Sequence, residues 1–272
     1  MLQYPTIDPV AFSVGPFFGI GPIRVHWYGI MYLLGFVAAV VLARIRIRKP
    51  GATWKAQDVE DLIFYCALGV IFGGRLGWIL VYGRDTIADD WRNIYRIWDG
   101  GMSFHGALVA VLIAMAIFAW RRNRRVADVF DFMAPLPCLG LFFGRIGNFI
   151  NSELWGKPTT LPWGFKVGDQ VLHPSQLYEA TLEGLVMFAV IWIFTSKPRP
   201  RLAPTGLFLL LYGTFRTAVE FVRVPDKNMG DHGYVAWGWL TTGQILSVPM
   251  ILVGIAVLVF AYRRNQPSGN YA

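Results

Sequence analysis

The chain of 272 residues is 55% apolar and only 15% charged, with a mean hydropathy of +0.45. It is therefore more apolar than a soluble globular domain usually is. Its net charge of +8 comes largely from short Lys- and Arg-rich tracts that lie between long apolar runs. Nucleic-acid-binding proteins instead spread basic residues over a soluble surface, so that class is excluded. The composition indicates an integral membrane protein.

Long apolar stretches follow one another along the whole chain, and a helix needs about 20 mostly apolar residues to cross a bilayer. The residues before the first stretch lack the cationic start and cleavage site of a removable signal peptide, so we expect the first span to be retained. Prolines and glycines interrupt the fourth stretch, which predicts a broken helix. The seven predicted spans are residues 27–44, 62–82, 103–120, 129–150, 176–195, 204–222 and 240–262.

Cations in the loops predict the orientation of these spans. Lys and Arg favour cytoplasmic loops, and they are richer in the alternate set IRIRKPGATWK, RRNRR, SKPRPR and the tail YRRNQ. We therefore predict an N-terminus outside and a cytoplasmic C-terminus. An odd number of spans likewise requires the two termini to lie on opposite sides of the membrane. No linker is long enough to separate domains. The predicted fold is an all-α, polytopic membrane helix bundle with one domain over residues 1–272.

Several polar side chains lie within or beside the predicted spans, where an ionisable residue costs about 2.5–3.5 kcal/mol to insert and so needs a partner or a function. Tyr212, Arg216 and Glu220 recur every four residues and share one helix face, which Arg223 extends. With the predicted orientation, five polar residues lie toward the outer ends of the helices, and Glu220 is one of them. They are His105, Asn148, Glu153, His173 and Glu220. The pattern favours a polar site on the outer side.

Purely structural interpretations stay open for single members of this set. Arg216 with Glu220, or Arg145 with Glu153, could form salt bridges that only hold helices together. Arg75 lies in GGRLG, whose glycines permit close helix approach, and a structural role is the simpler interpretation for it. A structural network alone does not explain a one-sided, cationic set that includes a histidine.

Other motifs exclude several kinds of chemistry. The glycine-rich string at 144–156, GRIGNFINSELWG, has neither a Walker lysine nor a preceding strand, so no nucleotide site is predicted. The four histidines lack metal-ligand spacing, and no metal or other cofactor is predicted. Cys66 and Cys138 lie in apolar stretches and are expected to pack as hydrophobic side chains. Trp27 is expected to anchor the first span at the membrane interface.

The string at 144–156 resembles the signature segment of bacterial prolipoprotein diacylglyceryl transferases. Other blocks agree with that family in order and spacing over essentially the whole chain. They are HWYG at 26–29, GGRLG at 73–77, WDGGMSFHG at 98–106, HPSQLYE at 173–179 and YGTFRTAVEFVR at 212–223. Two departures are Ala107, where the family commonly has a second glycine after the histidine, and a short loop at 157–172.

The resemblance implies a seven-helix enzyme of the bacterial inner membrane with its active site toward the periplasm. Such an enzyme moves the diacylglyceryl group of phosphatidylglycerol onto the lipobox cysteine thiol of a prolipoprotein, which forms a thioether and releases glycerol phosphate. Its partners are membrane lipids and prolipoprotein signal peptides. By position, the functional residues of the family correspond here to Tyr28, His105, Arg145, Asn148, Glu153, Gly156, Tyr212, Arg216 and Glu220.

The chemistry of this reaction suggests roles for some of these residues. Arg145 and Arg216 are expected to grip the phosphate, because a guanidinium can bind phosphate bidentately. We expect Glu153 and Glu220 to orient the arginines, and Asn148 and Tyr28 to donate further hydrogen bonds to the head group. His105 is the candidate base for the attacking thiol, with phosphate binding or capping of the third span as alternatives. The reactive thiol is expected to come from the substrate.

Two other functions stay open from the residues alone. A transporter or flippase for an anionic solute or lipid would also use buried arginines and a broken fourth helix, although no clear internal repeat supports it. A purely structural membrane subunit is the third possibility, and it leaves the polar set unexplained.

Overall fold

A computed structural model of the protein describes residues 1–16, 21–81, 83, 90–96, 100–224, 234–236 and 240–270, with side chains for all of these except 234–236. Residue 82, where the second predicted span ends, and residues 98–99, where the WDGG block begins, lie outside the described residues. Within these ranges the chain is mainly helical.

Long apolar helices dominate the described part of the chain, and five of them could cross a membrane by length and composition. They are Trp27–Ile47 (α1), Ala56–Val81, Phe104–Arg121 (α5), Ser175–Phe194 and Thr242–Arg264 (α11). Val126–Met133 (α6) and Leu136–Ile150 (α7) form a bent pair that makes a sixth if it is one span. The expectation of a multi-pass helical membrane protein is confirmed.

Two of these long helices change their hydrogen-bond pattern part of the way along. The first comprises Ala56–Leu68 (α2), the π-helical Gly69–Gly73 (η1) and Gly74–Val81 (α3). The second comprises Ser175–Glu179 (α8), the π-helical Ala180–Val186 (η4) and Met187–Phe194 (α9). π-Helical turns are rare and often occur at functional sites.

Helix α10, Ala203–Glu220, occupies the position of the predicted sixth span at 204–222. It is less apolar than the five helices above, because it contains Arg216 and Glu220 in its last two turns and several threonines and glycines along its length. The expected break in the fourth span also lies where the sequence predicts it, since Pro135 and Pro137 lack the backbone N–H that a continuous helix needs.

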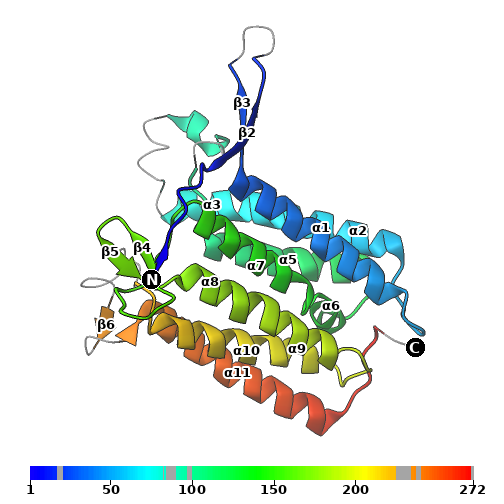
Figure 1. The fold of residues 1–272 in the computed structure, drawn as a ribbon. Helices are drawn as coiled ribbons and strands as arrows, with labels where there is room; N and C mark the ends of the chain where they lie inside the picture. The colour runs from blue at the N-terminus through cyan, green and yellow to red at the C-terminus, as the bar shows by residue number, and fades with distance from the viewer. Residues whose placement is uncertain are drawn as a thin grey trace. The chain divides into compact units, whose positions relative to one another are not determined.

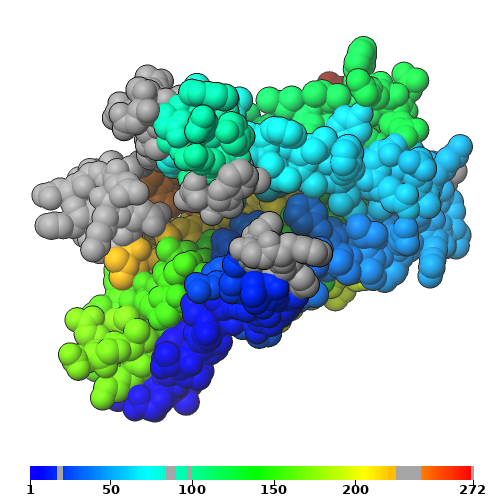
Figure 2. Space-filling model, turned by 90° about the horizontal axis from the view of Figure 1, so that it is seen from above, coloured from blue at the N-terminus to red at the C-terminus, as the bar shows by residue number. Residues whose placement is uncertain are grey.

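Short strands in the loops were not part of the all-α expectation. Val10–Val14 (β2) and Ile23–His26 (β3) pair in antiparallel fashion, as do Tyr234–Ala236 (β6) and Leu240–Thr241 (β7). Leu2–Gln3 (β1) runs parallel to Phe165–Val167 (β4), which pairs with Gln170–Leu172 (β5). Figure 2 shows the dark blue N-terminal segment beside this yellow-green hairpin. The short 157–172 loop is thus tied to the start of the chain. One 3₁₀ turn, η2, covers Trp91–Ile94.

The chain folds into two compact units. Unit 1 contains residues 1–42 and 131–268, and in it α7, α8–α9, α10 and α11 lie in succession (Figure 1). Its apolar core is formed by the fully or almost fully buried Ala134, Cys138, Met187 and Ile191, around which side chains of α10 pack. This unit contains most of the predicted site residues.

Unit 2 contains residues 43–130 together with the end of the chain from 269. Its helices α2, η1 and α3 pack against α5. The chain end is held by hydrogen bonds from Gly269 N to Asp128 Oδ1 (2.9 Å), from Asn270 Nδ2 to the Asp128 carbonyl (2.9 Å) and from Trp54 Nε1 to Asn270 Oδ1 (2.7 Å). A buried Asn270 therefore completes a unit that begins more than 200 residues earlier in the chain.

Candidate active site

Helix α8 and the π-helical segment η4 that continues it place two carboxylates in the interior of unit 1. Ser175 begins the helix and donates a hydrogen bond from Oγ to the Leu154 carbonyl at 2.6 Å, which ties the turn after α7 to α8. Glu179 and Glu183 follow at i and i+4 on this helix, and their residues are 1% and 0% exposed. A close contact lets α7 approach them, because a Cβ on Gly184 would lie only 2.6 Å from Phe142 Cβ. Arg145, one turn beyond Phe142, thereby reaches the carboxylates.

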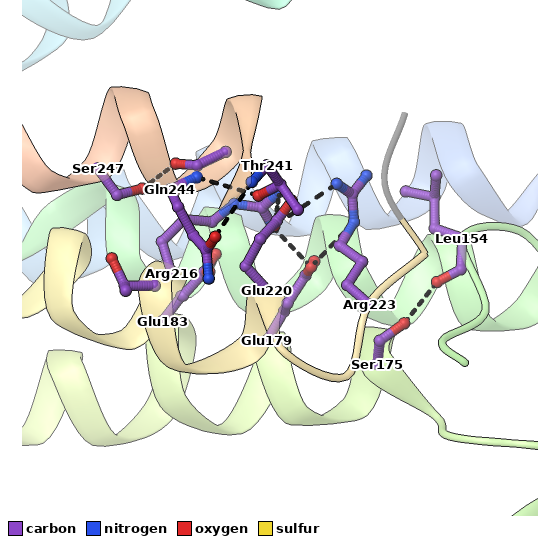
Figure 3. Close-up of polar contacts among 12 residues, drawn as sticks. Leu154, Ser175, Glu179, Glu183, Arg216, Glu220, Arg223, Thr241, Gln244 and Ser247 are labelled. Carbon is purple, nitrogen blue, oxygen red and sulfur yellow. Dashed lines mark hydrogen bonds and ion pairs between the residues drawn. The ribbon is translucent and has the colours of Figure 1, made fainter. Parts of the chain in front are cut away.

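Glu179 is the centre of the polar cluster. One carboxylate oxygen lies 2.5 Å from Arg145 Nε, and the other lies 2.7 Å from Arg216 Nη1 and 3.5 Å from Arg223 Nε. Figure 3 shows Glu179 directed from its helix toward Arg216 and Arg223 of the neighbouring chain segment. A single buried carboxylate thus joins arginines from α7, from α10 and from the residues just after α10.

Glu220 closes the cluster from the other side of Arg216. Its Oε2 lies 2.9 Å from Arg216 Nη2 and 3.8 Å from Arg223 Nη1. Arg216 therefore uses its two terminal nitrogens on different carboxylates, one in its own helix and one in α8. The i, i+4 spacing that the sequence shows between Arg216 and Glu220 corresponds to this ion pair.

Glu153 contacts two amides, and it is not the partner that the sequence suggested for Arg145. Asn148 Nδ2 donates to Glu153 Oε2 at 3.1 Å, and Asn151 Nδ2 donates to Oε1 at 3.3 Å. The carboxylate that pairs with Arg145 is Glu179, which is far from it in sequence. A pairing of Arg145 with Glu153 was therefore wrong, because the turn after α7 directs Glu153 back to Asn148.

Tyr28 packs on the same face of α7. A Cβ on Gly147 would lie 2.9 Å from Tyr28 Cδ2, so the absence of a side chain at Gly147 brings the tyrosine ring against the helix next to Asn148. The Tyr28 hydroxyl lies 3.4 Å from that of Tyr32. Tyr28, Arg145 and Asn148 consequently belong to one neighbourhood in unit 1.

Gly156 and Tyr212 have packing roles in this neighbourhood. Gly156 N donates to the His173 carbonyl at 2.9 Å, and a Cβ on Gly156 would lie 2.5 Å from the Val222 carbonyl oxygen. Three chain segments meet there, including the one that holds Arg223. Tyr212 stacks on Phe208 with ring centroids 6.1 Å apart, beside the apolar core.

His105 and Arg75 both belong to unit 2. His105 is exposed in the first turn of α5, where Ser103 caps the helix by accepting a hydrogen bond from Gly106 N at 3.2 Å. Capping of this helix therefore falls to Ser103. The Arg75 guanidinium donates to the carbonyls of Asn93, Ile94, Gly100 and Gly101. These hydrogen bonds favour the structural interpretation of Arg75 as the anchor of the loop before α5.

Three charged members of the cluster were absent from the predicted site, namely Glu179, Glu183 and Arg223. The two glutamates lie inside the predicted span 176–195, so the rule that an ionisable residue in a membrane helix needs a partner or function applied to them as well. Arg223 continues the stripe of Arg216 and Glu220 at i+3. The sequence thus carried a signal for all three.

The charges in the cluster suit it to bind an anion. Three guanidinium groups and three carboxylates meet here, and the side chains of Arg145 and Arg216 are 21% and 13% exposed whereas those of Glu179 and Glu220 are each 2% exposed. The arginines are therefore the members that an entering ligand can touch. Carboxylates behind them hold the guanidinium groups in place, so little reorganisation is needed on binding. Among the described residues no group of His, Cys, Asp and Glu side chains is placed to hold a metal ion.

The fold is that of a multi-pass helical membrane protein, and its polar centre consists of arginines paired with buried carboxylates. The family model for prolipoprotein diacylglyceryl transferase matches residues 16–260. The chain is 50% identical over 268 residues to the phosphatidylglycerol–prolipoprotein diacylglyceryl transferase of Pseudomonas aeruginosa (strain LESB58), with 97% of each chain covered. It is 52% identical over 269 residues to the protein of that name from Coxiella burnetii (strain RSA 331 / Henzerling II), with 98% of this chain and 100% of the relative covered. The chain belongs to the prolipoprotein diacylglyceryl transferase family.

Proposed function

We propose that this protein is a transferase that moves the diacylglyceryl group of phosphatidylglycerol to the lipobox cysteine of prolipoproteins, as the names of its relatives describe in part. The reaction would be the first step of lipoprotein maturation. The observation that carries the proposal is the joining of Arg145 and Arg216 through Glu179, which presents two guanidinium groups with buried support to one anionic head group.

The chemistry of the transfer matches this arrangement. A sulfur–carbon bond forms between the cysteine and the glycerol carbon, and the bond from that carbon to the phosphate oxygen breaks. The leaving glycerol phosphate gains negative charge on its oxygens as the bond breaks, and the thiol proton passes to a base or to the phosphate. Fixed guanidinium donors in a low-dielectric site stabilise that developing charge.

In this proposal the other residues support the arginines and the head group. Glu179 and Glu220 orient Arg216, and Glu179 orients Arg145. Asn148 and Tyr28 offer hydrogen-bond donors beside α7, and Glu153 fixes the amide of Asn148. Gly156 and Tyr212 maintain the packing of the segments that carry Arg223 and Arg216.

His105 is proposed as the base that takes the proton of the lipobox thiol. A thiol must become a thiolate to attack carbon well, and an exposed imidazole can accept its proton near neutral pH.

The proposal also includes seven spans, one membrane domain over residues 1–272, an outside N-terminus and a cytoplasmic C-terminus. The site then faces the periplasm at the inner membrane, with prolipoprotein signal peptides and membrane lipids as partners.

The test is to give the purified protein labelled phosphatidylglycerol and a peptide that contains a lipobox cysteine. We expect a thioether-linked peptide and free glycerol phosphate. Substitution of Arg145→Ala should reduce turnover by about 10²-fold or more, and His105→Gln should do so by a comparable factor, since each removes a transition-state interaction. Folded wild-type protein that moves the lipid across vesicles without forming a thioether would instead support a flippase.

A further inference from the structure

The turn that follows α7 has a strained backbone. Ser152 and Leu154 have φ angles of 56° and 60°, in the left-handed region that residues other than glycine seldom adopt. Strain of this kind persists only where surrounding contacts hold the backbone in place. The turn matters for the candidate site, because Glu153 lies between these two residues and accepts a hydrogen bond from the side-chain amide of Asn148.

Contacts from α8 hold the far end of this turn. The Ser175 hydroxyl donates to the Leu154 carbonyl at 2.6 Å, as Figure 3 shows. The side-chain amide of Gln176 donates to the Glu153 carbonyl. Ser175 and Gln176 are 0% and 1% exposed, so both donors are part of the packed interior. Two successive carbonyls of the turn are therefore fixed by buried side chains of one helix.

Tyr4, which follows strand β1, holds the turn from its α7 end. Its hydroxyl oxygen lies 2.8 Å from the Phe149 carbonyl oxygen and 2.9 Å from that of Ile150, in the last turn of α7. Carbonyls at the end of a helix lack partners within it, so the hydroxyl proton that these two share caps α7 from a distant part of the chain. Partial burial raises the pKa of the Tyr4 phenol, and the hydroxyl therefore stays protonated as a donor.

An aromatic cluster fixes the Tyr4 ring in this position. The ring meets Phe149 and Trp155 edge-on, with centroid distances of 5.4 and 5.2 Å. Phe165 of strand β4 contacts the same two rings, at centroid distances of 5.4 and 6.0 Å. Trp155 also donates from Nε1 to Ser152 Oγ at 3.1 Å, on the strained turn itself. The pairing of β1 with β4 thus brings Tyr4 to the turn.

We propose that Tyr4 is a positioning residue for the transfer reaction, because it holds the strained turn in which Glu153 orients the Asn148 amide. The inference rests on the proposed function. Asn148 Nδ2 carries two hydrogens, of which one is donated to Glu153 at 3.1 Å and the other can be donated to an oxygen of the lipid head group. Loosening of the turn would let that donor turn away from the head group. Tyr4 would thus act through Glu153 and Asn148 without touching the substrate.

Hydrogen exchange of the intact protein in detergent tests whether Tyr4 holds the turn. Tyr4→Phe removes the hydroxyl and keeps the ring contacts. We expect faster exchange of the backbone amides of residues 151–153, which donate to carbonyls of α7, and no change elsewhere. The matched control is Tyr65→Phe, which removes a hydroxyl contact with Arg121 in unit 2 and should leave the turn as it is in the wild type. Unchanged exchange of 151–153 in Tyr4→Phe would overturn the proposal.

Kinetics test whether the turn acts on the reaction through Glu153. Tyr4→Phe should lower kcat/KM for phosphatidylglycerol about fivefold, the usual effect of one hydrogen bond. Glu153→Gln already weakens the link to Asn148, so Tyr4→Phe should lower kcat/KM by less than about twofold more in that background. Tyr65→Phe should leave kcat/KM unchanged in both backgrounds. No loss from Tyr4→Phe in the wild type, or an equal loss in the two backgrounds, would overturn the proposal.

The two measurements separate this inference from the proposed function. If folded wild type forms no thioether, the proposed function fails, and the exchange of residues 151–153 still decides whether Tyr4 holds the turn. If wild-type turnover is normal and Tyr4→Phe changes neither the exchange nor kcat/KM, the positioning role alone fails. Thermal unfolding of each variant, compared with that of Tyr65→Phe, checks that the fold is retained.

Discussion

Arg216 joins two carboxylates that come from different helices. Its Nη1 lies 2.7 Å from Glu179 and its Nη2 lies 2.9 Å from Glu220. Only a planar, forked side chain can make both contacts at once, so a lysine of equal charge cannot replace it. The geometry of the guanidinium, beyond its charge, is what the cluster depends on.

Substitution Arg216→Lys should therefore lower kcat/KM for thioether formation by about 10²-fold, since one ammonium cannot hold both carboxylates and grip a phosphate bidentately. The measurement is turnover with phosphatidylglycerol and a lipobox peptide. A matched control is Arg44→Lys, because the pair of Arg44 with Glu60 is 2.6 Å long but about half exposed. An equal loss in both variants would contradict the role given to the fork of Arg216.

His173 gives a pH dependence outside the membrane helices. Partial burial beside Tyr178 lowers the pKa of this imidazole below its ordinary value of 6.5. The unfolded chain therefore binds a proton more readily than the folded one, so stability is fully present above about pH 6.5 and falls as the pH drops toward the folded-state pKa.

We expect thermal unfolding to occur at a lower temperature at pH 5.5 than at pH 7.5, and we expect His173→Gln to reduce that difference. Unfolding scans at the two pH values in the same detergent measure it. The exposed His105 offers a control variant, His105→Gln, which should retain the wild-type difference. An unchanged difference in His173→Gln would assign the acid sensitivity to other groups.

At the scale of elements, the approach of α7 to η4 determines where Arg145 meets its carboxylates. Gly184 makes this approach possible, because a Cβ there would lie 2.6 Å from Phe142 Cβ and 2.9 Å from Phe142 Cα. The second of these atoms is backbone and cannot move aside as a side chain can. Even one methyl group would therefore shift a helix.

Gly184→Ala should destabilise the protein by about 1–3 kcal/mol, the usual cost of overpacking a close contact. It should also reduce turnover, because Arg145 would be displaced from Glu179. Thermal unfolding and the thioether assay measure these effects. Gly140→Ala on α7 is the matched control, since a Cβ there would have no atom within 4 Å. Full activity in Gly184→Ala would show that the helix contact does not position Arg145.

The sequence predicts the long elements better than their contacts. Apolar runs predict helices close to observed ones, as with 103–120 against Phe104–Arg121, although the helix of the run at 62–82 begins at Ala56. The i, i+4 spacing predicts the pairing of Arg216 with Glu220. Arg145 pairs with Glu179, 34 residues away, and spacing within one helix carries no information about such a contact. The strands of the loops are only two to five residues long, too short for a clear alternating pattern.

At the scale of the whole molecule, the predicted orientation can be tested with single cysteines. Cys66 and Cys138 are 7% and 0% exposed, so both can be replaced by Ala to provide an unreactive background. In that background Ser13→Cys should react with a membrane-impermeant maleimide on the outside of intact cells. Asn123→Cys should react only in inverted vesicles, because the RRNRR loop is predicted to be cytoplasmic. The reverse labelling pattern would contradict the proposed orientation.

The hydrogen bonds of Gly269 and Asn270 to Asp128 and Trp54 have a consequence for the order of synthesis. A ribosome makes residues 43–130 early but adds 269 and 270 only after all of unit 1. The early helices are therefore in the membrane before the hydrogen bonds of Asp128 and Trp54 to residues 269 and 270 can form. Unit 2 is therefore completed only after unit 1 has been made, and loss of residues 269 and 270 should be costly for segments inserted long before.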